Sequence, residues 1–380
     1  MRGGTSKGVF FVLDDLPASA RADSAVRDRL LLRVIGSPDT YEKHIDGMGG
    51  ATSSTSKVVL VSRSARPDCD VDYLFGAVEI TQPLIDWSGN CGNLTTAVGP
   101  FAIQRGLVSA PRDGLATVRI WQANIGKRIV ATVPMRDGAV LEIGDFELDG
   151  VPFPGAEIAL EFLDPGGSEE KGTKLFPTTH PAEILYVPGV GAIEMTLITA
   201  GNPTVFVLAE TLGLSGTESQ GDVNGNPALL EKLEAIRAHG AVAMGLAKTA
   251  QEATAHRPAT PKIAFVSSPR AYRTSNGRDM AAADYDLAVR ILSMGKLHHA
   301  ITGTGAVATA AAAAIPGTII ARAIPPGDLN LLRVGHPSGL LKVGAQVRGT
   351  GEDAVVEAVR LSRTARRLMD GVVLVPPDVD

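Results

Sequence analysis

The chain contains little cysteine. Only Cys69 and Cys91 occur among its 380 residues, and their positions are unrelated. This usage excludes a disulfide framework and a cysteine-based zinc site. Cys69 stands in the charged, proline-containing segment 66–70, where we expect an incidental loop thiol. So few cysteines fit a reducing compartment, and we expect the protein in the cytoplasm.

Aromatic residues and positive charge are also scarce. Phe, Trp and Tyr together make up 4% of the chain, and 36 lysines and arginines stand against 41 acidic residues, for a formal net charge of −5. Stacking platforms for bases and a basic footprint are therefore both missing. We expect no nucleic-acid partner.

Long apolar runs are absent too. The sequence starts without the apolar segment of a signal peptide, and no uncharged apolar run reaches membrane-spanning length. We therefore expect a soluble globular protein with no membrane partner. Its length is sufficient for two domains of ordinary size.

Familiar cofactor and nucleophile motifs are missing as well. The turn 3–8 resembles a phosphate loop only superficially, because it lacks the four-residue spacer and the Gly-Lys-Ser/Thr order. The chain has no dinucleotide fingerprint and no Gly-x-Ser-x-Gly elbow. His298, His299 and His336 lie near glycine turns without carboxylates at ligand spacing, so we expect them to form hydrogen bonds rather than bind metal. A site with neither cofactor nor metal is expected.

What the chain does have is a cysteine in an unusual setting. The stretch 86–93 places Cys91 among small polar residues and glycines, and the small and apolar residues over 94–107 predict a helix. At the first turn of that helix, free N–H groups and the helix dipole favour an anion, either a substrate carboxylate or a thiolate. The alternative is a buried cysteine beside a helix entry. Gly89 and Gly92 favour a site, because glycine lets a ligand approach the backbone.

A lysine follows the other conspicuous loop. The small-residue segment 45–56 leads into Lys57 and the apolar strand predicted over 58–61. Burial would lower the pKa of this lysine from about 10.4, and a value near 7–8 makes a competent general base. The alternative is a surface lysine at the start of a strand.

Other segments predict the surrounding elements. A strand is expected over 9–12, and a helix over 25–35 that ends at Gly36. The turn-rich, charged segment 161–179 is either a loop or a domain boundary. The chain closes with a helix or a pair of strands over 355–375.

The second half repeats the arrangement of the first. The segment 293–301 leads into the turn 302–305, and an alanine-rich helix is predicted over 306–315. This is again a glycine-containing polar turn that enters a buried helix of small residues. Two such units predict a pseudo-twofold, with both turns facing one cleft between domains.

These features together suit one kind of chemistry. Anion-holding turns, a lysine and a thiol, without a cofactor, fit the abstraction of a proton next to a carboxylate. Isomerisation, racemisation and tautomerisation of a polycarboxylic acid all meet this description.

Several long motifs resemble signatures of the PrpF family, and together they span nearly the whole chain. They are the runs 1–8, 45–57, 70–76, 86–93, 293–300 and 335–339. Within the family, Ala51–Lys57 and Asp70–Gly76 resemble the 2-methylaconitate cis–trans isomerases of propionate breakdown. The oxalomesaconate tautomerases of the family usually carry a different loop before the lysine.

This resemblance implies an α+β fold. Two pseudo-symmetric domains similar to those of diaminopimelate epimerase are expected, each a curved, mostly antiparallel sheet or barrel around a central helix. The active site would lie in the cleft between them. We expect domains over 1–187 and 188–380, with the final segment packing back on the first domain.

The resemblance also implies roles for residues. Lys57 matches the family's catalytic lysine and Cys91 its cleft cysteine, which either acts as an acid or only lines the pocket. Lys57 would remove an allylic proton from 2-methyl-trans-aconitate, and rotation and reprotonation would give the cis isomer for the 2-methylcitrate cycle. The residues expected to hold the carboxylates of this small tricarboxylate are Gly3, Gly4, Thr5, Ser6, Asn90, Gly92, Asn93, Lys296, Thr302, Gly303, Thr304, His336 and Ser338.

Rival functions remain open. Thr302 stands where a two-thiol epimerase would have its second cysteine, which argues against racemisation by paired thiols. The chain could instead isomerise 4-oxalomesaconate or methylitaconate. It could also be a non-catalytic helper that protects an aconitase-like iron–sulfur dehydratase, since the family allows a functional pairing with such an enzyme. The sequence leaves the formation of a homo-oligomer open.

Overall fold

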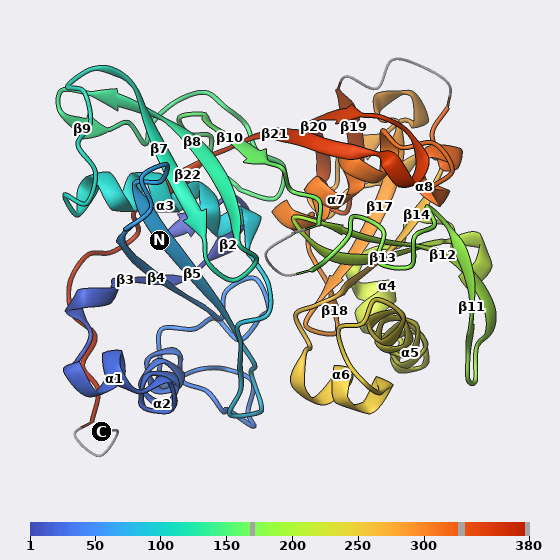
Figure 1. Cartoon of the computed structure of the whole chain (residues 1–380), viewed down its shortest axis with the longest axis horizontal. Helices are drawn as coiled ribbons and strands as arrows, with labels where there is room; N and C mark the ends of the chain where they lie inside the picture. Colours follow the sequence, from blue (N-terminus) through green and yellow to red (C-terminus); the bar gives the residue numbers. More distant parts are fainter. Residues whose placement is uncertain (168–171, 326–330, 377–380) are drawn as a thin grey trace. The chain divides into compact units, whose positions relative to one another are not determined.

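The structure is a computed structural model that describes residues 1–167, 172–325 and 331–376 (Figure 1). The chain divides into two compact units. Unit 1 contains residues 1–147, 153–160 and 363–380, and unit 2 contains residues 148–152 and 161–362. The chain therefore passes between the units at residue 160, at the start of the turn-rich segment 161–179, of which residues 168–171 lie outside the described part.

Unit 1 contains a mixed sheet and a small three-stranded sheet with the order β2-β1-β22. Within the mixed sheet, β3 is parallel to β4, β4 is antiparallel to β5, β5 is parallel to β7, and β7 is antiparallel to β8. The strands are β1 (Arg2–Gly3), β2 (Ser6–Lys7), β3 (Val9–Val12), β4 (Lys57–Arg63), β5 (Val71–Val78), β6 (Ile85–Asp86), β7 (Gly114–Gln122), β8 (Lys127–Arg136), β9 (Ala139–Val140) and β22 (Ala365–Arg366).

The helices of unit 1 follow local signals in the sequence. They are α1 (Ala18–Ala22), α2 (Ser24–Ile35) and α3 (Gly92–Gln104). Asp23 caps α2 by accepting a hydrogen bond from the Ala25 N–H, and Gly36 ends it with a φ of +86°. The predictions of a helix ending at Gly36 and of a strand over 9–12 are confirmed.

Helix α3 is the buried centre of unit 1. Every residue from Gly92 to Ala102 is buried, and β1, β7, β8 and β22 pack around it (Figure 1). Small residues permit this close packing: a Cβ on Gly99 would lie 2.9 Å from Cγ2 of Val133. The helix begins two residues earlier than the sequence predicted, because Cys91 caps it and Gly92 and Asn93 form its first turn.

Unit 2 repeats the strand pattern of unit 1. Strand β13 is parallel to β14, β14 is antiparallel to β17, β17 is parallel to β19, and β19 is antiparallel to β20. Its strands are β11 (Glu183–Val187), β12 (Gly191–Ala200), β13 (Asn202–Leu208), β14 (Lys262–Ser267), β15 (Tyr272–Arg273), β16 (Asp279–Met280), β17 (Leu287–Ser293), β18 (Lys296–Leu297), β19 (Leu332–His336) and β20 (Gly339–Arg348). The repeat predicted from the sequence is thus present in the topology.

The helices of unit 2 also repeat that plan. They are α4 (Gln220–Asn224), α5 (Pro227–Ala243), α6 (Ala250–His256), α7 (Gly303–Ala313) and α8 (Ile319–Ala323). All residues of α7 are buried, and β12, β13 and β20 pack against it. As α3 lies between β6 and β7 along the chain, so α7 lies between β18 and β19. Helix α5, between β13 and β14, takes the place that α2 has between β3 and β4.

Two strands carry the chain from one unit to the other. They are β10 (Ile158–Leu163) and β21 (Val355–Arg363). Of the two forms expected for 355–375, the structure has strands, β21 and β22, and no regular element follows over 367–376. Among the described residues, no helix is long and apolar enough to cross a membrane.

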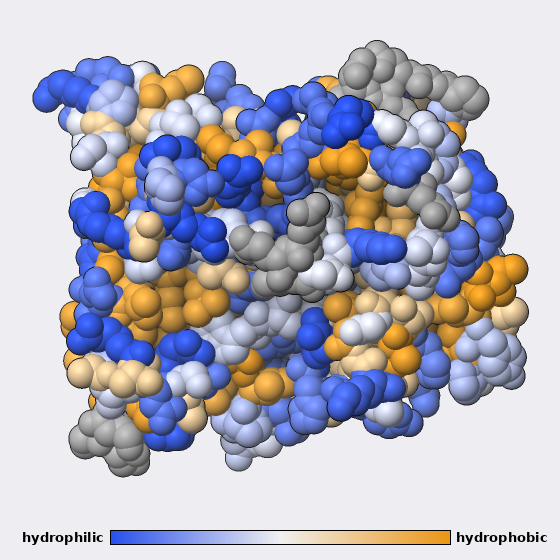
Figure 2. All heavy atoms as spheres, in the orientation of Figure 1, coloured by the Kyte–Doolittle hydropathy of each residue, from blue (hydrophilic) through white to orange (hydrophobic). Residues whose placement is uncertain are grey.

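Hydrophobic side chains also gather outside the two central helices. Figure 2 shows such a patch over the part of unit 1 that contains β3. A mostly apolar pocket of about 760 Å³ lies there, lined by residues of β3, the segment 15–17, α2, α3 and the segment 367–375. Neither Lys57 nor Cys91 lines it.

Candidate active site

Lys57 is buried at the first position of β4. Its side chain is only 6% exposed, so the alternative of a surface lysine is wrong. The side-chain nitrogen Nζ donates a hydrogen bond to Ser6 Oγ at 3.0 Å and lies 3.4 Å from Cys91 Sγ. The ring of Phe75 stands 5.9 Å from Nζ. The structure therefore brings the lysine and the cysteine singled out in the sequence into direct contact.

Cys91 is the N-cap of α3. Its sulfur accepts a hydrogen bond from the Leu94 N–H at 3.5 Å, which satisfies one of the free donors of the first turn. The positive end of the α3 dipole points at this side chain. Below it, the hydroxyl of Tyr73 donates to the Cys91 carbonyl at 3.3 Å, and burial raises the pKa of Tyr73, which keeps it a donor. Tyr73 is a supporting residue that sequence reasoning missed.

The turn between β1 and β2 lies against the same helix end. Gly4 has a φ of +50°, and a Cβ there would lie 2.5 Å from Asn93 Oδ1, so only glycine fits. A Cβ on Gly3 would lie 2.6 Å from the Asn93 carbonyl. The Asn93 amide donates to Thr5 Oγ1 at 2.9 Å. Predicted residues Gly3 to Ser6 and Asn93 are thus brought together.

Asn90 and Gly92 complete this end of α3. Asn90 is buried, and its Oδ1 accepts a hydrogen bond from Thr95 Oγ1 at 3.4 Å. Gly92 is the first residue of the helix. Together with Ser6, Lys57 and Cys91, these groups form what we call the unit 1 cluster.

The loop before Lys57 is held by a buried histidine. His44 Nδ1 accepts a hydrogen bond from the Ala51 N–H at 3.2 Å and lies 3.3 Å from Ser56 Oγ. The residue is only 3% exposed. Burial lowers the pKa of His44, against the opposing charge of Asp39. This anchor, which contacts Ser56, the residue next to the lysine, was not predicted.

Unit 2 contains a corresponding turn. Thr302 caps α7 by accepting a hydrogen bond from the Gly305 N–H at 3.1 Å, with Gly303 as the first helical residue. Thr304 Oγ1 accepts a hydrogen bond from the Asn202 amide at 3.1 Å. Asn202 follows Gly201, whose φ is +70°. The sequence analysis did not select Asn202, although it directly follows a glycine with positive φ, as Thr5 does.

His336 and Ser338 form a second cluster in unit 2. The Ser338 N–H donates to His336 Nδ1 at 3.2 Å, and Ser338 Oγ donates to the His299 carbonyl at 2.5 Å. The hydroxyl of Tyr272 donates to the His336 carbonyl at 2.8 Å, and burial raises the pKa of Tyr272 to about 12. The rings of His298 and His299 stack at 4.7 Å.

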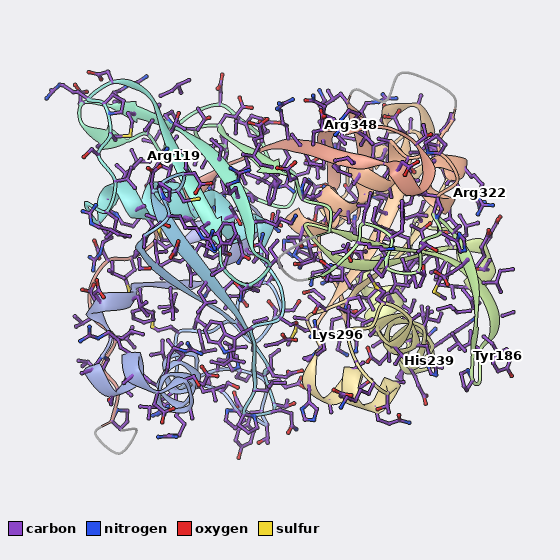
Figure 3. The ribbon with its side chains drawn as sticks, in the orientation of Figure 1. Arg119, Tyr186, His239, Lys296, Arg322 and Arg348 are labelled. Atoms are coloured by element: carbon purple, nitrogen blue, oxygen red, sulfur yellow. The ribbon has the colours of Figure 1, made fainter. Side chains whose placement is uncertain are left out.

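Lys296 differs from the other predicted binding residues. Its side chain is exposed on β18, in the part of unit 2 that holds α4 to α6 (Figure 3). Within the described ranges, no hydrogen bond joins it to Thr302 or His336. The same described part of the chain contains no group of three or more His, Cys, Asp or Glu side chains that could hold a metal ion.

The unit 1 cluster has the parts for moving a proton. An amine and a thiol are in contact, and the first turn of α3 supplies N–H groups and a positive potential for negative charge. A substrate carboxylate at this helix end would bring its neighbouring C–H group close to two groups that can exchange protons.

Known proteins match the chain over nearly its full length. A family model described as PrpF protein matches residues 1–376. The 2-methyl-aconitate isomerase of Shewanella oneidensis is 59% identical over 381 residues, which cover 99% of this chain and 96% of the relative. The protein of the same name from Cupriavidus necator is 57% identical over 383 residues, which cover 100% of this chain and 96% of the relative.

Solved structures match as well. The crystal structure of methylitaconate-delta-isomerase has a TM-score of 0.77 at 39% identity and covers 100% of this chain and 95% of its own. A probable proline racemase from Agrobacterium radiobacter has a TM-score of 0.56 at 14% identity, with 99% and 93% covered, and shows the fold alone. The predicted α+β, epimerase-like fold is thereby confirmed.

Proposed function

Because the chain belongs to the PrpF family, we propose that it is an isomerase that converts 2-methyl-trans-aconitate into 2-methyl-cis-aconitate. The observation that carries this proposal is the contact of 3.4 Å between Lys57 Nζ and Cys91 Sγ at the N-terminus of α3. The substrate assignment is supported by relatives of that name at 57–59% identity.

In the proposed reaction, Lys57 takes the allylic proton. The C–H bond electrons enter the neighbouring double bond and carboxylate, which gives a delocalised carbanion. Rotation about the former double bond and return of a proton to the allylic carbon then give the cis isomer, with no net change in atoms or electrons. Lys57 must enter this step as a free amine, and Ser6 Oγ holds its nitrogen in place.

Negative charge develops on the substrate during this step. The N–H groups of the first turn of α3 and the side chains of Thr5 and Asn93 lie where they can stabilise it. Cys91 either returns the proton or only lines the pocket. We propose carboxylate binding for the Thr302–Thr304 turn, His336 and Ser338 of unit 2 as well, and a weaker contribution for the exposed Lys296.

The wider setting belongs to the same proposal. The reaction takes place in the cytoplasm without a cofactor and serves propionate breakdown through the 2-methylcitrate cycle. Its product passes to an aconitase-like dehydratase, with which the chain is functionally paired.

A related tricarboxylate is the alternative substrate. The structural relative is named for methylitaconate, and its identity of 39% is well below that of the two 2-methyl-aconitate isomerases. 2-Methyl-trans-aconitate, methylitaconate and 4-oxalomesaconate all react through the same proton abstraction. Their relative rates, measured side by side, therefore identify the preferred substrate.

Proton NMR in deuterated water tests the proposal. We expect wild-type protein to form the cis isomer with deuterium at the allylic carbon, and Lys57→Ala to lose both product and exchange. Lys262→Ala is the matched control, because Lys262 is also a buried lysine at the start of a strand but donates to Ser293 Oγ and the Ala259 carbonyl. Folding of each variant is checked by circular dichroism.

The variants also assign the roles. Exchange that survives in Lys57→Ala but not in Cys91→Ala would make the thiol the base. A folded wild-type protein that neither turns over nor exchanges any tricarboxylate would contradict the isomerase and favour the helper of an iron–sulfur dehydratase.

A further inference from the structure

A second buried cation belongs to unit 1, and no described residue supplies a counter-charge for it. Arg363 is the last residue of β21 and is 1% exposed. Its Nε and Nη2 atoms are buried and have no hydrogen-bond partner among the described residues. No described carboxylate forms an ion pair with it.

An unpaired buried guanidinium lowers the stability of a folded protein. Burial lowers the pKa of Arg363 to about 10, and desolvation is the whole cause. The guanidinium therefore remains charged at neutral pH. A buried charge without a partner costs free energy that a buried ion pair recovers in part, so it is retained where an anion joins it.

Other buried arginines in the chain do have partners. Arg290 is fully buried, but its Nε donates to the Glu218 carbonyl at 2.7 Å and its Nη1 to the Val289 carbonyl at 3.1 Å. Its guanidinium also lies 5.0 Å from the ring centre of Tyr272. Arg237 forms an ion pair with Glu234 at 2.6 Å. Arg363 is different because its Nε and Nη2 have no hydrogen-bond partner among the described residues.

The backbone places Arg363 next to the substrate-binding turn of the same unit. The following residue, Thr364, accepts a hydrogen bond through its carbonyl from the Gly4 N–H at 2.9 Å. Ala365 then pairs with Gly3 in the small sheet β2-β1-β22. Gly4 in turn lies against Asn93, two residues beyond the cap Cys91. Arg363 thus adjoins the strand that holds the turn on the end of α3.

We propose that Arg363 binds a carboxylate of the polycarboxylate substrate. The inference rests on the proposed function and adds the group that supplies a full positive charge. Backbone N–H groups and hydroxyls offer only partial charges, whereas a guanidinium can hold a carboxylate through two parallel hydrogen bonds. The substrate carboxylate would supply the anion that the protein itself does not.

Substitution of Arg363 separates this role from a structural one. Arg363→Met keeps much of the side-chain volume and removes the charge. We expect its melting temperature without ligand to equal or exceed that of the wild type, and its KM for 2-methyl-trans-aconitate to rise about 100-fold. Arg363→Lys keeps the charge without the planar fork, and its KM should rise about tenfold.

Arg290→Met is the matched control. Because Arg290 has three carbonyl or ring partners, its loss should lower the melting temperature and leave KM within about twofold. Binding is also measured independently of catalysis, from the rise in melting temperature that saturating trans-aconitate produces. We expect this rise in wild-type and Arg290→Met protein, and its loss in Arg363→Met.

The outcomes keep the two proposals apart. If the wild type binds trans-aconitate without isomerising the methylated substrate and Arg363→Met does not bind, the isomerase proposal fails and the role of Arg363 holds. If the wild type isomerises the substrate and both Arg363 variants keep its KM, the role of Arg363 is overturned. If Arg363→Met does not fold, the KM of Arg363→Lys tests the role of Arg363.

Discussion

Ser6 is the residue through which the unit 1 cluster is held together. Its hydroxyl accepts the hydrogen bond of Lys57 Nζ at 3.0 Å and lies 4.0 Å from Cys91 Sγ. The serine comes from the start of β2, the lysine from the start of β4 and the cysteine from the cap of α3. The orientation of the amine therefore depends on three separate segments.

Removal of this hydroxyl should disorient the amine. For Ser6→Ala we expect kcat to fall about tenfold, the equivalent of one lost hydrogen bond, with KM changed much less. Steady-state kinetics on 2-methyl-trans-aconitate measure this split. Ser64→Ala serves as the control, because Ser64 Oγ only accepts a hydrogen bond from the exposed Arg66 N–H. A Ser6→Ala variant with wild-type kcat would show that Lys57 needs no such support.

His44 should make the stability of the protein depend on pH. Its Nδ1 must be unprotonated to accept from Ala51, and burial lowers its pKa in the folded state. The unfolded chain takes up a proton near the ordinary value of about 6.5, so stability is full above that pH and falls as the pH drops below it. Thermal melting between pH 7.5 and 5 measures this loss.

Two substitutions isolate the contribution of His44. In His44→Asn, the amide oxygen can accept the same hydrogen bond, asparagine tolerates the φ of +51°, and the side chain does not titrate. We expect it to flatten the loss of stability between pH 6.5 and 5. His44→Ala should lower the melting temperature at pH 7.5. An unchanged pH dependence in His44→Asn would assign the effect to other groups that titrate in this range.

At the scale of elements, the two central helices use one polar contact in opposite senses. In unit 1, Asn93 on the helix donates to Thr5 on the turn. In unit 2, Asn202 on the turn donates to Thr304 on the helix. Each pair joins a turn that contains a glycine with positive φ to the second residue of a buried helix. The same hydrogen bond between a turn and a helix therefore occurs in both units, with the asparagine and the threonine exchanged.

Sequence patterns predicted several of the helices but only part of the contacts between elements. Glycine turns, small-residue helices and the Gly36 stop are local signals, and they predicted α2, α3 and α7 to within a few residues. The contact of Lys57 with Cys91 joins positions 34 residues apart, and the resemblance rather than periodicity brought them together. Asn202, Tyr73 and Arg363 were missed because their partners, or the lack of them, depend on the folded chain.

The alanine-rich helix α7 should not tolerate one more alanine at Gly305. A Cβ there would collide with Cδ1 of Ile291 and lie 2.5 Å from Thr302 Oγ1, the atom that caps the helix. Helix propensity favours alanine by about 1 kcal/mol, but the clash and the lost cap outweigh it. We expect Gly305→Ala to lower the melting temperature by several degrees.

Gly221→Ala is the control for this prediction. Gly221 lies in α4, where the nearest atom to an added Cβ is Ser219 Oγ at 3.7 Å. The propensity gain should appear there without a clash, as an unchanged or slightly raised melting temperature in the same calorimetric experiment. Equal effects of the two substitutions would refute the steric explanation.

At the scale of the whole molecule, the main feature is where the chain passes from one compact unit to the other. The resemblance led us to expect one division of the chain, between residues 187 and 188. The compact units change at four places, after residues 147, 152, 160 and 362. These bounds follow contacts between segments far apart in sequence, such as β1 with β22, and periodicity within a window carries no information on them.

This route also sets the order in which the protein can mature on the ribosome. A chain is made at about 5–20 residues per second, and units generally fold as their residues emerge. Unit 1 begins first, yet it has to wait for residues 363–380, whereas every residue of unit 2 has been made by residue 362. The half that carries Lys57 and Cys91 is thus the last to be finished. A nascent chain would hold Lys57 and Cys91 in an incomplete sheet until synthesis is nearly over.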